Sequence, residues 1–350
     1  MATTPQRYPE ISVSGTPREL GRQIGEAARE MIRAFCDIAL QRINLTANVT
    51  REQSHAVAAS CLDIARRYNS PLLDELEGTA EAAGVELIDL MLLQVRNQLT
   101  AESESGCTSL SLQPNLVAQN WDNDPALDDF TIVLTRHPND RPSLTTLTQA
   151  GLIAYIGFND SGIGACLNTL PAPSRATGVP HYFTLRDLYE QTSLADAIES
   201  IRRAQRAIPA NIILATPQGP ADLEVTIDDV HVLTSASDLD VTHTNHCLHP
   251  DLLPINDRFP ELIQSHSRKK RIDALLSAAG AGNSIEAIKT ALRDHDGHPY
   301  SICRHPNTDP ETGFWTTVFS VIIEPSARRM HVSRGTPCDR PYEVYEMSAT

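Results

Sequence analysis

Apolar residues recur at helical spacing through the first hundred positions of the chain. Pro17 can occupy the first turn of a helix, and after it the apolar side chains return every three or four residues, as Leu20, Ile24, Ala28, Ile32, Phe35 and Ile38. Three more amphipathic stretches follow, at 54–68, 72–83 and 87–99, and Gly84 ends the second of them. The pattern predicts a helical N-terminal part with short turns.

Beyond residue 106 the pattern changes to short β-rich runs separated by Gly, Pro, Asn and Asp. Such runs are typical of consecutive antiparallel strands. Strands are predicted at 108–112, 116–119, 131–134, 144–148, 152–158, 164–168, 211–215, 221–227, 231–233 and 241–244, with a closing hairpin at 315–323 and 328–332. Helices are predicted at 183–191, 194–206, 258–279 and 284–293. Strand groups that alternate with paired helices predict an α+β fold, with two antiparallel sheets covered by helices.

Composition and charge narrow the class of protein. The 350 residues are 41% hydrophobic and 21% charged, which is typical of a globular protein with a sizeable core. A formal net charge of −15 argues against nucleic acid or an anionic membrane surface as a partner. Residues 1–15 lack the apolar core of a secretory signal, and no apolar run approaches the roughly 20 residues of a membrane span. A cytoplasmic location is therefore expected.

The seven cysteines are widely spaced and odd in number, which suits a reducing compartment better than a disulfide framework. Cys107 stands out because it lies at the junction of the helical and β parts, after the polar segment 101–106. The preceding Gly106 has no side chain to shield its carbonyl from attack. A cysteine at a strand start is more often a buried core residue, so position alone does not establish a nucleophile.

Three other segments carry polar side chains suited to chemistry: 120–124, 243–247 and 299–304. His243, His246, His249 and Cys247 are of zinc-ligand type. However, a strand-like run points alternate residues to opposite faces, which disfavours a metal site there. We expect no metal and no cofactor, and a Cys/His metal-dependent hydrolase remains an alternative.

Several motifs resemble the acyl-coenzyme A:6-aminopenicillanic acid acyltransferase (isopenicillin N acyltransferase) family of N-terminal nucleophile hydrolases, and they occur along the chain in the family's order. They are Gly106-Cys107-Thr108-Ser109, Asn120-Trp121-Asp122, His243-Thr244-Asn245-His246-Cys247 and Ser301-Ile302-Cys303-Arg304, with Gly15-Thr16-Pro17, Gly157-Phe158-Asn159 and Thr177-Gly178-Val179-Pro180. The resemblance implies a four-layer αββα sandwich, in which two antiparallel sheets lie between helical layers.

The resemblance also implies that the chain cuts itself at the Gly106-Cys107 bond. The products are an α chain, 1–106, and a β chain, 107–350, which are the parts of one integrated fold. Cys107 then carries a free α-amino group, whose ordinary pKa of about 7.7–8.0 leaves part of it neutral as a general base for the thiol. Acyl groups would pass through a Cys107 thioester.

Supporting roles follow from the same resemblance. Asn245 matches an asparagine that donates its amide N–H to the oxyanion, and Asp122 matches an aspartate of processing and positioning. Glu224 and Thr226 stand where the family has an acidic residue and a hydroxyl near the site. Phe314 occupies the place of a family arginine, and Arg304 is the candidate substitute.

The expected substrate is a small N-acyl or peptide-like amide. Acyl-CoA is a possible donor, although no basic phosphate cradle is recognisable. Whether the acyl acceptor is water or an amine stays open, because it depends on how the pocket excludes water. A different class is also open, in which the chain is an unprocessed, non-catalytic binding relative.

Overall fold

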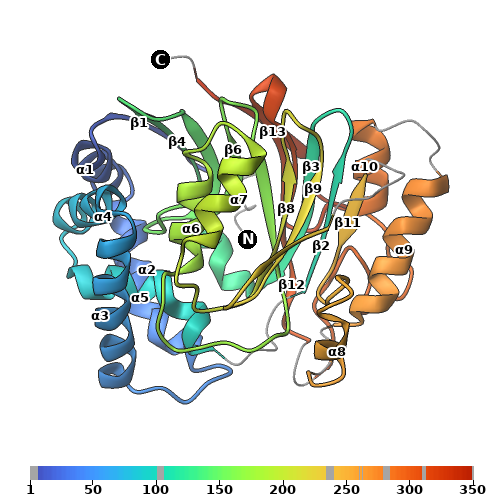
Figure 1. The fold of residues 1–350 in the computed structure, drawn as a ribbon, viewed down its shortest axis with the longest axis horizontal. Coiled ribbons are helices and arrows are strands. Elements are labelled where there is room, and N and C mark those ends of the chain that lie inside the picture. Colours follow the sequence, from blue (N-terminus) through green and yellow to red (C-terminus); the bar gives the residue numbers. More distant parts are fainter. Residues whose placement is uncertain are drawn as a thin grey trace.

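Two sheets lie face to face between layers of helices (Figure 1). A computed structural model describes residues 7–100, 106–233, 240–259, 261, 263–278, 284–309 and 313–348. The polar segment 101–105, predicted to precede the nucleophile, lies outside the described residues. The four-layer α+β fold class predicted from the sequence is confirmed.

The larger sheet has eight strands in the order β1-β4-β5-β6-β7-β8-β9-β10. They are β1 (Glu10–Gly15), β4 (Thr131–Pro138), β5 (Leu144–Gln149), β6 (Ile156–Asn159), β7 (Gly164–Thr169), β8 (Ala210–Ala215), β9 (Ala221–Val225) and β10 (Val230–Leu233). The β1 strand pairs parallel with β4, and the other neighbours are antiparallel. An N-terminal segment thus forms one edge of a sheet built otherwise from residues beyond 130.

The smaller sheet has six antiparallel strands in the order β11-β2-β3-β12-β13-β14. They are β11 (Val241–His243), β2 (Gly106–Leu112), β3 (Leu116–Asn123), β12 (Thr316–Glu324), β13 (Arg329–Arg334) and β14 (Tyr342–Glu346). Strands β2 and β3 pack against β7 and β8 of the larger sheet. Because both faces of β2 and β3 are covered, every residue of β2 is buried.

The helices cover the outer faces of the two sheets. They are α1 (Pro17–Ala27), α2 (Arg29–Ile43), α3 (Arg51–Tyr68), α4 (Ser70–Ala83), α5 (Leu87–Leu99), α6 (His181–Leu188), α7 (Leu194–Arg202), α8 (Leu253–Asn256), α9 (Ser265–Ala278) and α10 (Ile285–Leu292). Figure 1 shows α1–α7 on the side of the larger sheet and α8–α10 on the side of the smaller sheet. The helices thus cover the outer faces of the sheets, and the inner faces of the two sheets pack against each other.

The observed elements differ from the predicted ones in three places. The helix predicted from Pro17 to Ile38 is two helices, since the backbone at Ala28 leaves helical geometry (φ −110°, ψ 17°). The predicted helix at 258–279 begins only at Ser265. Strands β1 and β14 were not predicted: each pairs at an outer position of a sheet, where tertiary pairing rather than local pattern decides the structure.

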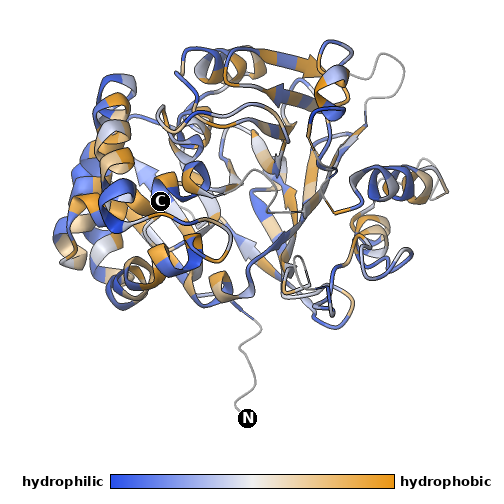
Figure 2. Ribbon diagram, turned by 90° about the horizontal axis from the view of Figure 1, so that it is seen from below, coloured by the Kyte–Doolittle hydropathy of each residue, from blue (hydrophilic) through white to orange (hydrophobic). Residues whose placement is uncertain are grey.

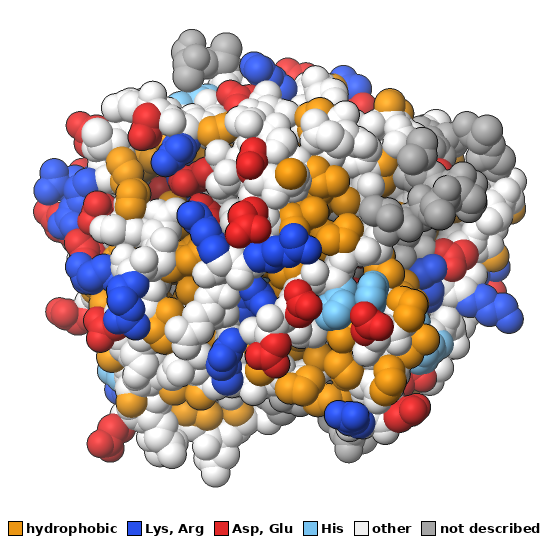
Figure 3. Space-filling view, in the orientation of Figure 1, with side chains coloured by type: hydrophobic (Ala, Val, Ile, Leu, Met, Phe, Trp, Pro, Cys, Tyr) orange, Lys and Arg blue, Asp and Glu red, His pale blue; other side chains and the backbone are white. Residues whose placement is uncertain are grey.

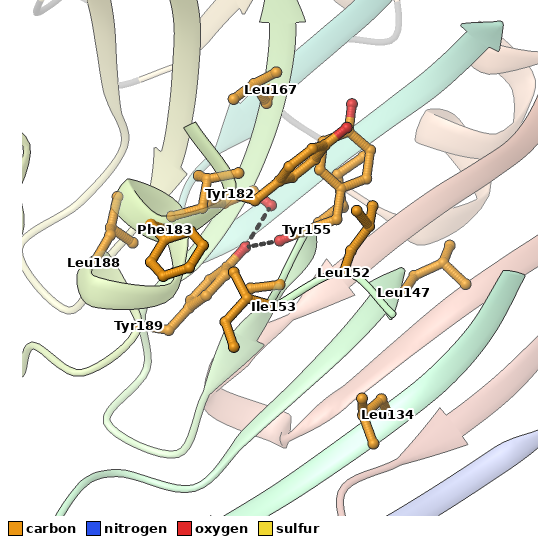
Figure 4. Packing of buried hydrophobic residues seen from close by; sticks show 14 of the residues in the cluster. Leu134, Leu147, Leu152, Ile153, Tyr155, Leu167, Tyr182, Phe183, Leu188 and Tyr189 are labelled. Carbon is orange, nitrogen blue, oxygen red and sulfur yellow. Dashed lines mark hydrogen bonds between the residues drawn. The ribbon is translucent and has the colours of Figure 1, made fainter. Parts of the chain in front are cut away.

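One hydrophobic core joins the segments on either side of residue 106. It includes Leu20 and Met91 from the helices together with Trp121 and Phe319 from the smaller sheet. Figure 2 shows hydrophobic residues along the strands and the inward helix faces. Figure 4 shows part of this core, where the Tyr189 hydroxyl donates to the main-chain oxygen of Tyr155 at 2.9 Å.

A buried ionic cluster fastens α4 to the larger sheet and to α6. Glu75 is 1% exposed and accepts from Arg136 Nε at 2.7 Å and from Arg186 at 3.3 Å. Arg186 also pairs with Glu190 at 2.7 Å. Buried charges are tolerated only when they are paired in this way.

The surface carries charges of both signs. Figure 3 shows Lys and Arg side chains interspersed with Asp and Glu over one face of the molecule. Among the described helices, none is both long enough and apolar enough to cross a membrane.

Candidate active site

The predicted nucleophile lies at the start of a central, fully buried strand. Gly106 opposes Asp122 and Cys107 opposes Trp121 in the register of β2 and β3. The Cys107 side chain is only 1% exposed. The sequence motifs at 106–109 and 120–122 are therefore neighbours because their strands pair.

Asn245 follows β11 and holds the main-chain nitrogen of Cys107. The Cys107 N–H donates to Asn245 Oδ1 at 2.9 Å, and Asn245 Nδ2 donates to the main-chain oxygen of Thr169 at 2.9 Å. The side-chain oxygen, rather than the amide N–H of the predicted oxyanion role, thus faces the backbone of Cys107. The Nδ2 amide carries a second N–H, so the predicted role stays a prediction.

Arg268 is a site residue that the sequence reasoning missed. Its guanidinium donates to the Cys107 carbonyl at 2.6 Å, to Thr108 Oγ1 at 3.0 Å and to Asn245 Oδ1 at 2.8 Å. Burial lowers the pKa of Arg268 to about 10, so the group keeps its charge near neutral pH. The sequence feature that could have revealed Arg268 is its spacing, because it lies four residues before the buried Ile272 and therefore on the same inward face of α9.

Asp122 places one carboxylate oxygen beside Gly106. Thr317 Oγ1 donates to Oδ1 at 2.7 Å, whereas Oδ2 is buried and has no hydrogen-bond partner among the described residues. A Cβ placed on Gly106 would lie 3.4 Å from Oδ2. Burial raises the pKa of the Asp122 carboxyl to about 6, against the opposing charges of Arg268 and Arg304. Its pKa is therefore in the range suited to exchanging protons near neutral pH.

The thiol itself is held in its protonated form. Burial raises the pKa of Cys107 to about 12, and the charge of Asp122 raises it further, while Arg268 opposes both effects. A thiol with this pKa needs a base at the moment of attack. Asp122 opposes Gly106 in the strand register, so its carboxylate lies on the other face of the sheet from the Cys107 side chain, and its influence on the thiol in the described structure is through its charge.

Arg304 is fully buried, and its charge acts on Asp122 as that of Arg268 does. Its main-chain N–H donates to Thr317 Oγ1 at 3.0 Å, and its Nε donates to the Trp315 carbonyl at 3.3 Å. Its charge lowers the pKa of Asp122, as noted above. Phe314, where the family arginine was expected, stacks on Trp315 with ring centroids 4.6 Å apart.

Glu224 and Thr226 are not in contact with Cys107 in the described hydrogen bonds. Glu224 accepts from His243 Nε2 at 2.9 Å and from the His249 N–H at 3.0 Å, so it anchors the two ends of the segment that carries Asn245. Thr226 caps the turn before β10, accepting from the Asp229 N–H at 2.9 Å. The described contacts thus indicate that Glu224 positions the segment that carries Asn245, whereas Thr226 stabilises a turn.

The zinc arrangement considered for the 243–249 segment is not formed. His243 bonds Glu224, and His246 Nδ1 lies 2.7 Å from Ser265 Oγ. Metal-ligand side chains of the described residues gather in two different groups: His249 of this segment with His231 and Asp251, and His295 with Cys303, His305 and Cys338.

A largely apolar pocket adjoins the site. Its walls include Phe35, Ala39, Ile43, Leu127, Leu167, Leu170, Pro209, Phe314 and Trp315. It holds about 1110 Å³ of space, counting its open mouth. Asn123, next to Asp122 in the chain, and Thr169, which accepts from Asn245, also line it. Cys107, Asp122 and Asn245 are not themselves lining residues, so the pocket adjoins the site through Asn123 and Thr169.

Two lining residues present buried donors without partners. Arg96 Nη1 and both ring nitrogens of His181 have no hydrogen-bond partner within the described part of the chain. Burial, with a contribution from Arg96, lowers the pKa of His181 to about 3, so the ring is neutral. Arg42, in contrast, is satisfied by Asp124, whose Oδ2 accepts from its Nε at 2.6 Å.

The sequence comparisons place this α+β protein in a family of acyltransferases. The chain belongs to the acyl-coenzyme A:6-aminopenicillanic acid acyl-transferase family, whose model matches residues 111–339. A similar relative is the acyl-coenzyme A:6-aminopenicillanic-acid-acyltransferase 40 kDa form of Emericella nidulans. It is 28% identical over 346 residues, covering 97% of this chain and 95% of the relative.

Two solved structures are among those similar to part of this chain. The penicillin V acylase of Agrobacterium tumefaciens gives a TM-score of 0.46 at 10% identity, over 69% of this chain and 86% of the acylase. The C2A mutant of the conjugated bile acid hydrolase of Clostridium perfringens gives 0.43 at 10% identity, over 70% of this chain and 98% of the hydrolase.

Proposed function

We propose that the chain is a precursor that cuts itself between Gly106 and Cys107 and then acts on small N-acyl or peptide-like amides through a Cys107 thioester. The observation that carries the proposal is the setting of the Cys107 nitrogen and thiol. Asn245 holds the nitrogen at 2.9 Å, and the unpartnered carboxylate oxygen of Asp122 lies beside Gly106. The products are the α chain 1–106 and the β chain 107–350.

In the first step, the thiol proton of Cys107 passes through a water molecule at the start of β2 to the Asp122 carboxylate, and sulfur attacks the Gly106 carbonyl. The Gly106–Cys107 C–N bond breaks as the nitrogen takes up a proton, which leaves a Gly106 thioester on Cys107. Water then hydrolyses the thioester, so that Gly106 gains a carboxylate and Cys107 regains its thiol. The raised pKa of Asp122 makes it a stronger base than an ordinary carboxylate.

In the mature enzyme, the new α-amino group occupies the place of the Cys107 amide nitrogen, against Asn245 Oδ1. Its neutral fraction at physiological pH serves as general base for the thiol. The thiol attacks the substrate carbonyl, and the acyl group is held as a thioester until water or an amine takes it. Arg268 fixes the Cys107 main chain throughout, since it donates to the Cys107 carbonyl.

The substrate's acyl group fits the apolar pocket, with a hydrogen-bond-accepting or anionic group at its far end. A buried donor left without a partner is costly, and an acceptor on the ligand removes that cost. Arg96 and His181 supply such donors in the pocket wall. A carboxylate suits this pair best, because Arg96 is charged and the His181 ring is neutral.

Intact mass spectrometry of the purified chain tests the proposal. We expect two fragments that match 1–106 and 107–350, and amide hydrolysis or acyl transfer only in the cut sample. Cys107→Ala should stay uncut and inactive, whereas Cys166→Ala, which removes another buried thiol, should still cut. A wild-type chain that stays uncut on incubation and turns over no acyl donor would instead support a non-catalytic binding relative.

A further inference from the structure

A cluster of four metal-ligand side chains lies outside the proposed active-site contacts. It consists of His295, Cys303, His305 and Cys338, and all four ligand atoms lie within 4.8 Å of one another. The first three come from the segment between α10 and β12, and the fourth from the turn between β13 and β14. We propose that this cluster binds one Zn²⁺ ion as a structural site.

The distances match the edges of a zinc tetrahedron. With Zn–N of about 2.0–2.1 Å and Zn–S of about 2.3 Å, tetrahedral ligands stand about 3.3 Å (N to N) and about 3.6 Å (N to S) apart. The His295 and His305 Nε2 atoms are 3.0 Å apart. The His305 Nε2 atom lies 3.8 Å from Cys303 Sγ and 3.3 Å from Cys338 Sγ.

The donor set also selects the metal. Two thiolates and two imidazoles in a tetrahedral arrangement are typical of zinc. Binding converts both thiols to thiolates and releases two protons, while the imidazoles bind in their neutral form. All four positions are taken by the protein, so the ion has no open position for water, and the site is structural rather than hydrolytic.

Two hydrogen bonds order the ligand segments without the ion: one lies within the segment between α10 and β12, and the other joins that segment to the turn between β13 and β14. Cys303 N–H donates to the Asp294 carbonyl at 2.9 Å, and Arg293 Nε donates to the Pro337 carbonyl at 2.8 Å. Cys303 is buried, whereas His295 and Cys338 are exposed and leave a path from solvent. These contacts place the ligands before the metal arrives, which lowers the cost of ordering them on binding.

The site is joined to the candidate active site through a single residue. Arg304 stands between the ligands Cys303 and His305, and its main-chain N–H donates to the Thr317 hydroxyl that bonds Asp122. A bound ion fixes both neighbours of Arg304. Zinc therefore stabilises the main-chain N–H of Arg304 against the Thr317 hydroxyl that bonds Asp122.

Metal analysis of the full chain, purified under reducing conditions without chelator, tests the proposal. We expect about one zinc per chain in the wild type and in Cys36→Ser, a matched control on α2, and none in Cys303→Ser/Cys338→Ser. After zinc is removed, Co²⁺ should give the visible absorption of tetrahedral cobalt and a near-ultraviolet thiolate band. Both signals should be missing from the double variant.

A variant of an exposed ligand guards against misfolding. His295→Gln should fold and weaken zinc binding by more than about tenfold, the loss that even outer-shell partners cause. Removing zinc should lower the melting temperature of the wild type by about 5 °C or more. The proposal is wrong if the reduced wild type fails to take up zinc, if the double variant binds it equally, or if a Cys303–Cys338 disulfide is the native state and the reduced protein binds no metal.

Discussion

The Asp122 carboxylate lies beside Gly106, so that a Cβ on the glycine would stand 3.4 Å from Oδ2. The same oxygen has no hydrogen-bond partner among the described residues. The strand register sets this relationship, because Gly106 and Asp122 oppose each other in β2 and β3. The first residue of β2 and a carboxylate of β3 thus lie side by side, and neither sequence motif reveals this contact alone.

Replacing the carboxylate should separate folding from cleavage. Asp122→Asn keeps the shape and the Thr317 contact but removes the base, so self-cleavage should slow by about 10²–10⁴-fold. The rate is followed as loss of the uncut chain by mass spectrometry, with melting temperature as the control for folding. A variant that cuts at the wild-type rate would rule out Asp122 as the base.

Self-cleavage in the wild type should depend on pH through Asp122. Its carboxyl has a pKa raised to about 6 by burial, and only the ionised form accepts the thiol proton. The rate should therefore rise as the pH increases through about 6 and fall tenfold per unit below it. A cleavage rate that stays constant from pH 4.5 to pH 7.5 would contradict this assignment.

Substitution of Arg268 on α9 tests whether its buried guanidinium positions the Cys107 main chain for cleavage. Arg268→Met removes the donors to the Cys107 carbonyl and to Asn245, and we expect cleavage to slow by about tenfold or more. Lys270→Met, an exposed neighbour on the same helix, is the control and should leave the rate unchanged. Partial recovery of rate in Arg268→Lys would distinguish lost charge from lost geometry.

The pocket makes a prediction about substrate choice. Arg96→Met should lower kcat/KM by about tenfold, mainly through KM, for an N-acyl amide whose acyl chain ends in a carboxylate. The same chain ending in a methyl group should be turned over as before, which provides the control within one assay. Equal losses on both substrates would show that Arg96 supports the pocket rather than reads the substrate.

The buried ionic cluster makes a prediction about stability. Glu75→Ala leaves Arg136 and Arg186 buried without their shared carboxylate, and we expect a loss of about 3–5 kcal/mol in the free energy of unfolding. Urea denaturation of the uncut Cys107→Ala chain measures it without the complication of fragments. The exposed pair of Arg22 and Glu81 is the comparison, and Arg22→Ala should cost less than about 1 kcal/mol.

The sequence predicted the layers, most elements and the two motifs that pair at 106–107 and 121–122, because periodicity and contiguous motifs are local signals. The helix at 87–99 was placed at its observed bounds, and Gly84 ends the preceding helix with φ of 70°. Arg268 was missed because its meaning depends on what α9 packs against. The cluster of Cys338 with His295 was missed for the same reason, since the two lie on loops that are joined only in the folded chain.

The parallel pairing of β1 with β4 has a consequence for the fate of a cut chain. Residues 10–15 form an edge of the larger sheet and pair in register with 133–138, across the proposed cleavage point. Before cleavage, this docking is a unimolecular event whose ends are held by the chain. After cleavage, the same strand and its helices must find their partner by diffusion, so unfolded enzyme refolds at a rate that depends on concentration. For a chain cut as proposed, the precursor is the form that assembles, and the cut enzyme persists because it unfolds slowly, since it does not refold readily.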